Sequence, residues 1–300
     1  YKLDQQIARL ESAGAETPRP YKLVVLSDHG QSNGATFKQR YHMTLEDLIQ
    51  QLATEKFQVQ GGSEVHEDWK HVNVFLTEAV QYDTEAVSKP LGRALKRRSD
   101  EGQVALGPEG VKQERREDRA SEDLEPQAQI VVLASGNLGL VYSTRRDQRA
   151  TLEELEEYYP GLLDGLAGHE GIGFVMMRSS EHGAVVVGGA GRYYLADDRV
   201  EGVNPLEGFG PNAAQHLRRT DSFADAHDIL VNSFYNVETN EVAAFEELIG
   251  SHGGMGGYQT QPLLLYPAEW ELEEKELVGA AAVYRQLKSW LNQLGNGQAP

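Results

Sequence analysis

Two short stretches of this sequence place metal-binding types of side chain beside glycines. The first is Asp28-His29-Gly30, which follows an apolar run at residues 23–26. Such a run, bounded by turn residues, predicts a buried strand, and ligands gather beyond the carboxyl ends of strands in open α/β sheets. A carboxylate and a neutral imidazole suit zinc and similar metals. The stretch predicts Asp28 and His29 as metal ligands; the alternative is a turn or helix-cap role for Asp28.

The second stretch is the glycine-rich segment SHGGMGGYQT at residues 251–260, which contains His252. Glycine leaves the backbone almost bare and lets another group approach closely. One interpretation is a loop that brings the His252 imidazole close to a metal or an oxyanion. The other is a flexible surface loop with an incidental histidine. A further neighbouring pair, His227-Asp228, has the same chemistry, but Asp228 opens a predicted strand, which favours a structural role.

The composition narrows the classes of function. The chain has 300 residues, with 28 basic and 46 acidic side chains and a formal net charge of −18. This charge disfavours binding to a nucleic-acid duplex or to anionic lipid, and an acidic protein that handles phosphate esters needs a local positive charge such as bound metal ions. The sequence has no cysteine, so it has no thiolate zinc site. It also lacks the HExxH and GxxxxGK[ST] motifs, which leaves zincin and P-loop functions without support.

The predicted elements that position these residues alternate between helix and strand, which indicates an α/β fold. Capping boxes mark two helices, one at 44–52 with Thr44 and Asp47, the other at 151–159 with Thr151 and Glu154. Strands are predicted in a hairpin at 130–142, as three antiparallel strands within 173–195, and at 228–232 and 262–266. Further helices are predicted at 3–14, 64–82, 160–168, 212–219 and 274–294. The expected architecture is a central mixed, mainly parallel sheet flanked by helices.

The two stretches together resemble a known family. The wording YKLVVLSDHGQSNGATF, followed much later by AFEELIGSHGGMGGYQTQPLLLYP, resembles the alkaline phosphatase superfamily, most closely its nucleotide pyrophosphatase/phosphodiesterase branch. More narrowly, it is similar to bacterial phage-holin-family or alkaline-phosphatase-like proteins, in which a membrane segment accompanies a phosphoesterase domain. The similarity spans most of the chain except residues 84–128, which we interpret as a charged excursion from the domain.

The resemblance implies a two-metal phosphoester hydrolase acting on a phosphomonoester or phosphodiester. By it, Asp28 and His29 bind the metal that also holds the nucleophile, and His252 binds the other. Two divalent ions about 4 Å apart activate the nucleophile and stabilise the leaving oxygen. Zinc suits these ligands, with manganese as the alternative. A sulfatase or phosphotransferase on the same scaffold is the closest alternative chemistry.

The chain departs from the family pattern before the SDHG motif. In the family, a Ser or Thr nucleophile, an early Asp and a further Asp and His precede that motif, whereas residues 1–20 here contain Asp4 and no histidine. We therefore expect residues 1–300 to be the C-terminal part of one alkaline-phosphatase-like domain, with an incomplete metal set and no turnover by itself. Its partners would be the N-terminal remainder of the same protein and a phosphate-ester substrate, and membrane association would come from segments outside this chain. The alternative is a non-catalytic envelope-associated module that keeps the fold.

Overall fold

The chain forms two compact units, each with its own set of elements. A computed structural model describes residues 2–18, 21–53, 58–61, 99–100, 103–104, 128–248 and 250–295. Unit 1 comprises Tyr1–His29 and Pro262–Pro300, and unit 2 comprises Gly30–Gln261. The helix predicted at 64–82 lies outside the described residues. So does the charged excursion predicted at 84–128, apart from the paired two-residue strands β3 (Ser99–Asp100) and β4 (Gln103–Val104) and the first residue of β5.

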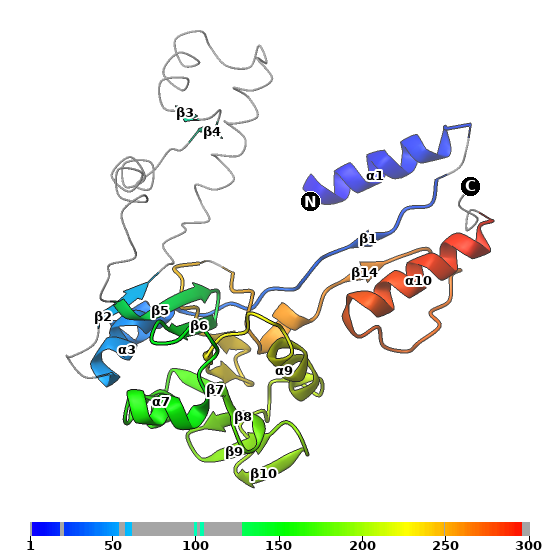
Figure 1. The fold of residues 1–300 in the computed structure, drawn as a ribbon. Coiled ribbons are helices and arrows are strands. Elements are labelled where there is room, and N and C mark those ends of the chain that lie inside the picture. The colour runs from blue at the N-terminus through cyan, green and yellow to red at the C-terminus, as the bar shows by residue number, and fades with distance from the viewer. Residues whose placement is uncertain are drawn as a thin grey trace. The chain divides into compact units, whose positions relative to one another are not determined.

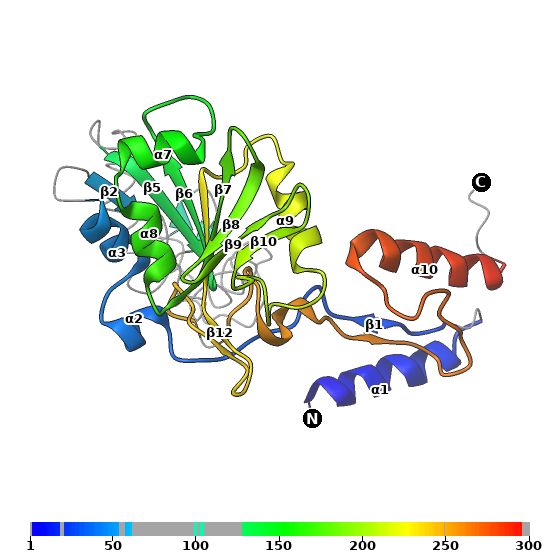
Figure 2. The same ribbon diagram turned by 90° about the horizontal axis from the view of Figure 1, so that it is seen from below.

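Unit 2 is built on one eight-stranded sheet (Figures 1 and 2), whose strand order is β10-β9-β8-β7-β11-β6-β5-β2. Among these described strands, β2 and β5 form a parallel pair and all the other neighbours are antiparallel. The strands are β2 (Gln58–Gly61), β5 (Ala128–Ser135), β6 (Leu138–Ser143), β7 (Ile172–Ser179), β8 (Gly183–Gly188), β9 (Gly191–Tyr194), β10 (Arg199–Gly202) and β11 (Ile229–Ser233).

Helices cover both faces of this sheet, as Figure 2 shows. Along β7, Val175 and Met177 belong to the apolar cluster on one face, and Phe174 and Met176 belong to the cluster on the other. The first face packs against α2 (Phe37–Tyr41), α3 (Leu45–Leu52), α7 (Leu152–Tyr158) and α8 (Leu162–Gly168), and the second against α9 (Ala213–Asp221). Because successive side chains of a strand point to opposite faces, β7 is buried on both sides.

The mixed sheet flanked by helices is confirmed, and so are the hairpin at 130–142, the three antiparallel strands within 173–195 and the strand at 228–232. The sheet is mainly antiparallel, however, where a mainly parallel one was predicted. Continuous apolar runs are typical of parallel strands because such strands are usually covered on both faces. Here antiparallel strands are covered on both faces, so the same runs arise. The short, polar strands β2 and β10 were not predicted.

Both predicted capping boxes are present. The Thr44 hydroxyl accepts the Asp47 N–H at 3.1 Å, and the Asp47 carboxylate accepts the Thr44 N–H at 2.9 Å. Thr151 and Glu154 exchange the equivalent bonds at the start of α7. These reciprocal bonds satisfy N–H groups that the first turn of a helix leaves without partners. The helices predicted at 160–168 and 212–219 are α8 and α9.

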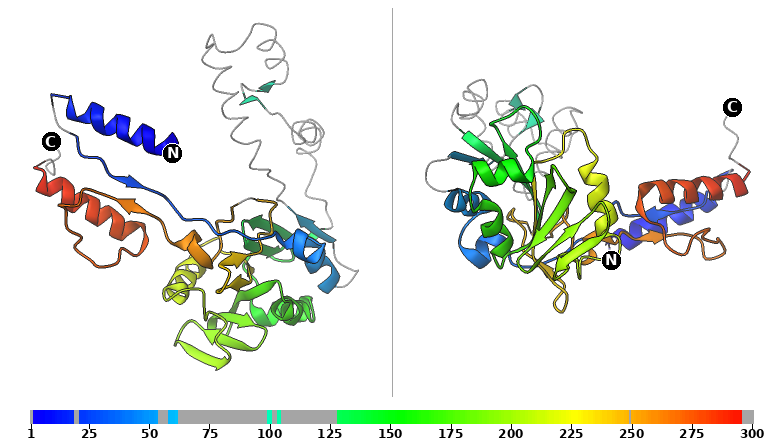
Figure 3. Two further views of the ribbon diagram at one scale, coloured as in Figure 1. Left: turned by 180° about the vertical axis from the view of Figure 1, so that it is seen from behind. Right: turned by 60° about the horizontal axis from the view of Figure 1, so that its bottom comes forward.

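The described residues of unit 1 form two helices and a two-stranded ribbon. These are α1 (Lys2–Ala15), β1 (Val25–Leu26), β14 (Leu264–Leu265) and α10 (Gly279–Gln293). The strands are antiparallel, with Val25 opposite Leu265, and the helices flank the ribbon (Figure 3). Helix α10 begins later than predicted, at Gly279. The segment before Gly279 is hydrogen-bonded to side chains of α10: the Trp290 indole and the Gln286 amide both donate to the Glu271 carbonyl.

The predicted buried strand at 23–26 is wrong in its length and its burial. Strand β1 has two residues, and Leu26 is 50% exposed. On β14, Leu265 is 56% exposed. A ribbon of two strands buries little apolar surface by itself, which explains the exposure. In the part of the chain that the structure describes, no helix is long and apolar enough to cross a membrane.

Candidate functional site

Asp28 and His29 follow the ribbon directly, at the end of the first segment of unit 1. Ser27 closes the pairing, because its N–H donates to the Leu263 carbonyl at 3.0 Å and its hydroxyl accepts the Leu263 N–H at 2.9 Å. The next two side chains face solvent, since the Asp28 side chain is 87% exposed and that of His29 is 38% exposed. One Asp28 oxygen accepts the His29 N–H at 3.0 Å. The other lies 3.5 Å from His29 Nε2.

The distance of 3.5 Å bears on metal binding. Two oxygen or nitrogen ligands that bind one tetrahedral zinc ion at about 2.0–2.2 Å lie roughly 3.3–3.6 Å from each other. The Asp28 oxygen and the His29 nitrogen have this separation, and one is a carboxylate and the other an imidazole. The pair therefore has donor types and a spacing compatible with one tetrahedral ion, at what is also the distance of an ordinary histidine–carboxylate contact.

His252 lies in unit 2, in a loop that is packed rather than loose. On its N-terminal side Ser251 is buried and exchanges backbone bonds with Ser32, at 2.7 and 3.0 Å. The carbonyl of His252 lies against the β5–β6 turn, so closely that a Cβ on Gly136 would approach it to 1.8 Å. The Gly136 N–H in turn donates to a Glu246 oxygen at 2.5 Å. The half-buried His252 is thus attached to a hairpin of the main sheet.

Two fully buried asparagines hold the loop beyond His252 through a single residue, Met255. The Met255 N–H donates to Asn232 Oδ1 at 2.7 Å. Its carbonyl accepts Asn137 Nδ2 at 2.9 Å and Asn232 Nδ2 at 3.1 Å. The sequence suggested turn or strand-end roles for these asparagines, and Asn137 does lie in the turn just before β6, Asn232 near the end of β11. Their role as anchors for a distant loop had no signal in the sequence beyond a polar residue at the end of an apolar strand.

Gln259 and Ser32 complete this buried group. The Gln259 amide donates to Asn137 Oδ1 at 3.0 Å and to the Gly256 carbonyl at 2.8 Å. The Ser32 hydroxyl donates to the same carbonyl at 2.9 Å. We refer to Ser32, Asn137, Asn232 and Gln259 as the amide cluster. All four are buried, and each contributes at least one side-chain bond to the loop or to another member.

The glycines of the loop are explained by this packing. Gly253, Gly256 and Gly257 have φ values of 111°, 106° and 71°, a region that other residues adopt at a cost. A Cβ on Gly254 would lie 2.3 Å from Asn137 Oδ1. The glycine-rich composition therefore reflects close approach to the amide cluster, and the interpretation as a loose surface loop is wrong for the backbone.

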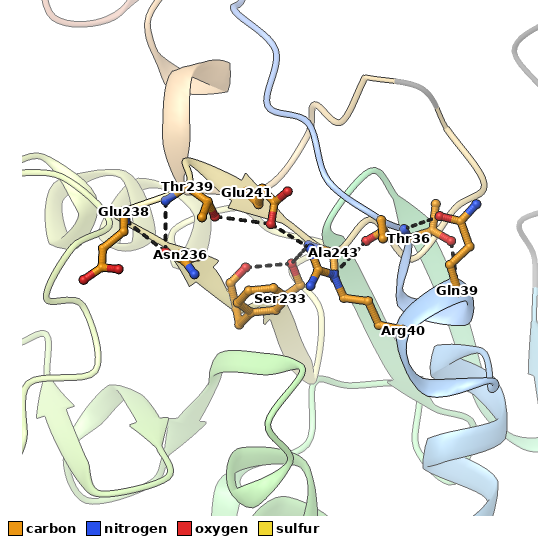
Figure 4. A network of polar contacts seen from close by, with 11 residues as sticks. Thr36, Gln39, Arg40, Ser233, Asn236, Glu238, Thr239, Glu241 and Ala243 are labelled. Atoms are coloured by element: carbon orange, nitrogen blue, oxygen red, sulfur yellow. Dashed lines mark hydrogen bonds and ion pairs between the residues drawn. The ribbon is translucent and has the colours of Figure 1, made fainter.

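The chain that follows His29 is also anchored in unit 2. The Gly30 N–H donates to the Gln259 carbonyl at 3.1 Å. Further along, Thr36 and Gln39 form a third capping box, which starts α2. Arg40 on α2 pairs with Glu241 at 3.1 Å (Figure 4) and stacks over the Phe234 ring. These bonds join α2 to the hairpin of β12 (Tyr235–Asn236) and β13 (Glu241–Val242).

The second histidine–aspartate pair has a structural role, as the sequence favoured. Asp228 accepts the N–H groups of Ser143 and Ala150, both at 2.6 Å, and burial raises its pKa. His227 is 2% exposed. Burial, with the nearby Arg149 guanidinium, lowers the pKa of His227 to about 4. His227 is therefore neutral near pH 7 and belongs to the core.

Within the described residues, no three His, Cys, Asp or Glu side chains lie together in a way that could hold a metal ion. Of the three predicted ligands, Asp28 and His29 form a neighbouring pair in unit 1, and His252 belongs to unit 2. No known family model, curated protein or solved structure matches this chain. A function for this chain can therefore be inferred only from the geometry of the site itself.

Proposed function

We propose that this chain supplies metal ligands to a metal-dependent hydrolase of phosphomonoesters or phosphodiesters. Asp28 and His29 would bind one divalent ion, and His252 would bind a second, with zinc favoured and manganese as the alternative. The observation that supports the proposal is the 3.5 Å separation of Asp28 Oδ2 and His29 Nε2 on an accessible turn. This is the separation expected of two ligands of one tetrahedral ion.

Asp28 and His29 have different roles as ligands in this proposal. Asp28 brings the negative charge that a cation needs in a site. Its other oxygen already accepts the His29 N–H, which orients the carboxylate. His29 contributes a neutral nitrogen. Divalent ions held in this way activate a hydroxyl nucleophile and neutralise charge on a phosphoryl group.

Two or three ligands do not complete a two-metal centre, so the proposal assigns the Ser or Thr nucleophile and the remaining ligands to polypeptide N-terminal to this chain. The surface of unit 1 supports this assignment. Leu26, Leu263 and Leu265 are each more than half exposed or at that limit, and a two-stranded ribbon is marginal in water. Further strands of an alkaline-phosphatase-like sheet would cover these leucines. Membrane association of the parent protein would come from segments outside this chain.

Zinc titration of the chain, with a chromophoric chelator as competitor, tests the ligand assignment. We expect Asp28→Asn and His29→Ala each to weaken zinc binding at least tenfold, because each removes one of two ligands. His252→Ala should remove a separate, weaker binding event. The matched control is His182→Ala. His182 also neighbours an exposed acidic residue, Glu181, but its Nε2 lies 3.9 Å from the nearest Glu181 oxygen.

Two results would contradict the proposal. One is unchanged zinc affinity in Asp28→Asn and His29→Ala. The other is an equal loss in His182→Ala, which would indicate non-specific binding to surface histidines. For turnover, the test is hydrolysis of bis-p-nitrophenyl phosphate by the parent protein that includes the upstream polypeptide. There, Asp28→Asn should lower kcat/KM by at least a hundredfold, a loss of about 2.7 kcal/mol in transition-state stabilisation.

A further inference from the structure

We propose that the amide cluster of Ser32, Asn137, Asn232 and Gln259 is a positioning group that fixes the loop backbone around His252, and with it the point and direction in which the imidazole leaves the loop. The inference deepens the proposed function, since it names the residues that would prepare one metal ligand. It rests on that function only for the metal. The positioning itself is a property of this chain and can be measured without metal.

The amide cluster is costly to bury. Four polar side chains are buried together, and a buried amide that lacks hydrogen bonds costs about 1–3 kcal/mol. Their bonds are directed mainly to the loop backbone. Three side-chain bonds end on the N–H and carbonyl of Met255, and two end on the carbonyl of Gly256. A cluster that served only the sheet would not need to meet on these two loop residues.

Buried contacts hold the backbone on both sides of His252. The residue before it, Ser251, is paired with Ser32. The carbonyl of His252 lies against Gly136, and Gly253 lies against the carbonyl of Ser135. Three residues later the amide cluster holds Met255. The backbone before, at and after His252 therefore makes close contacts with Ser32 and with the β5–β6 turn. These contacts determine the direction of its Cα–Cβ bond.

The glycine-rich loop loses much conformational entropy when it is ordered. Glycine loses more conformational freedom on folding than any other residue, and the segment from Gly250 to Gly257 contains five glycines. Without anchors such a segment would sample many conformations. The amide cluster offsets that cost at Met255 and Gly256. The small residues in turn let the backbone approach the asparagines closely, as the 2.3 Å clash at Gly254 shows. The cluster and the glycines thus depend on each other.

The test compares Asn232→Ala with a matched destabilising control, Val186→Ala. Val186 is fully buried in the apolar cluster that packs against α9, and it contributes nothing to the loop through a side-chain hydrogen bond. Two readouts follow the loop: amide hydrogen exchange of residues 251–257, and 15N relaxation of the His252 ring nitrogens. We expect Asn232→Ala to speed exchange at Met255 at least tenfold and to lower the order of the imidazole. Val186→Ala should do neither at equal global stability.

Two more variants keep the test decisive if Asn232→Ala fails to fold. Asn137→Ala removes one of the two amides that donate to the Met255 carbonyl and leaves the acceptor of the Met255 N–H in place, so a smaller effect is expected. Gly254→Ala leaves the cluster intact and pushes the loop away from it. Unchanged exchange at Met255 and unchanged imidazole order in all folded variants would overturn the inference.

Zinc binding separates this inference from the proposed function. If His252→Ala leaves zinc affinity unchanged, the assignment of His252 as a ligand fails, while the relaxation data still decide whether the cluster positions the imidazole. If His252 does bind zinc, Asn232→Ala should weaken that binding event about tenfold, and Val186→Ala should not. Loss of imidazole order without any loss of His252-dependent zinc affinity would contradict the positioning role in metal binding.

Discussion

The two units differ in how far their apolar and polar side chains are buried. In unit 2, both faces of the sheet are covered, and even the polar side chains of His227, Asn137 and Asn232 near strand ends are buried. In unit 1, the leucines of the β1–β14 ribbon are largely exposed. The predicted ligands are divided between these settings, since Asp28 and His29 are in unit 1 and His252 is in unit 2. Burial therefore explains the geometry around His252, whereas only local turn geometry explains the Asp28–His29 pair.

The largest expected effect in this comparison is in the core of unit 2. Phe174 is fully buried and stacks edge-on against Phe209, with ring centroids 5.0 Å apart. Phe174→Ala should destabilise unit 2 by about 3–5 kcal/mol, because it removes apolar contact and leaves a cavity. Urea unfolding followed by far-UV circular dichroism measures this. A loss below about 1 kcal/mol would mean that the sheet is not packed on both faces.

A slightly smaller effect is expected from pH. His227 has a pKa of about 4 in the folded protein, against about 6.5 in an unfolded chain. The unfolded state therefore takes up the proton first, so stability is complete above pH 6.5 and falls as the pH is lowered to 4. The loss should reach about 3 kcal/mol.

The check is urea unfolding at a series of pH values, for the natural chain and for His227→Gln. The neighbouring Asp228 also titrates, and its raised pKa acts in the opposite direction, but it is present in both proteins. The difference between the two pH profiles thus isolates His227. Parallel profiles between pH 6.5 and 4 would show that His227 is not buried as a neutral imidazole.

An intermediate effect is expected at a helix cap of unit 2. Thr151→Ala removes the hydroxyl that accepts the Glu154 N–H at the start of α7. The expected cost is about 1 kcal/mol, again measured by urea unfolding. Thr151→Ser retains a hydroxyl and serves as the control, with most of the stability expected to remain. Equal losses in both variants would indicate that the methyl group matters and the cap does not.

The smallest effect is expected on the ribbon of unit 1. Leu26 is 50% exposed and Leu265 is 56% exposed, so Leu26→Ser with Leu265→Ser should change stability by less than about 1 kcal/mol. Binding of the dye ANS should fall in the same variant, because exposed apolar surface binds it. A loss comparable to that of Phe174→Ala would show that the ribbon is buried, and it would remove the contrast between the units.

Local elements were well predicted, since residues close in sequence determine them. The boxes at Thr44 and Thr151 depend on bonds across three residues, and the β5–β6 hairpin depends on a short turn. The antiparallel direction within 173–195 was predicted correctly, but the direction of the sheet as a whole was not. Leu230 faces one apolar cluster while Ile229 and Val231 face the other, so this strand is apolar throughout, and an apolar run has no information about the direction of its neighbours.

The sequence by itself determined the helix caps, the hairpins and the residue types that suit metal binding at Asp28, His29 and His252. Only the tertiary structure decided which of these side chains are buried and what holds them. The bond from Asn137 to Met255 joins residues 118 positions apart, and no local pattern encodes such a pairing. It exists because a folded sheet brings the ends of β6 and β11 under one loop, where buried amides must find hydrogen-bond partners. The accessible Asp28–His29 turn is therefore determined by local sequence, whereas the His252 loop is determined by long-range buried contacts.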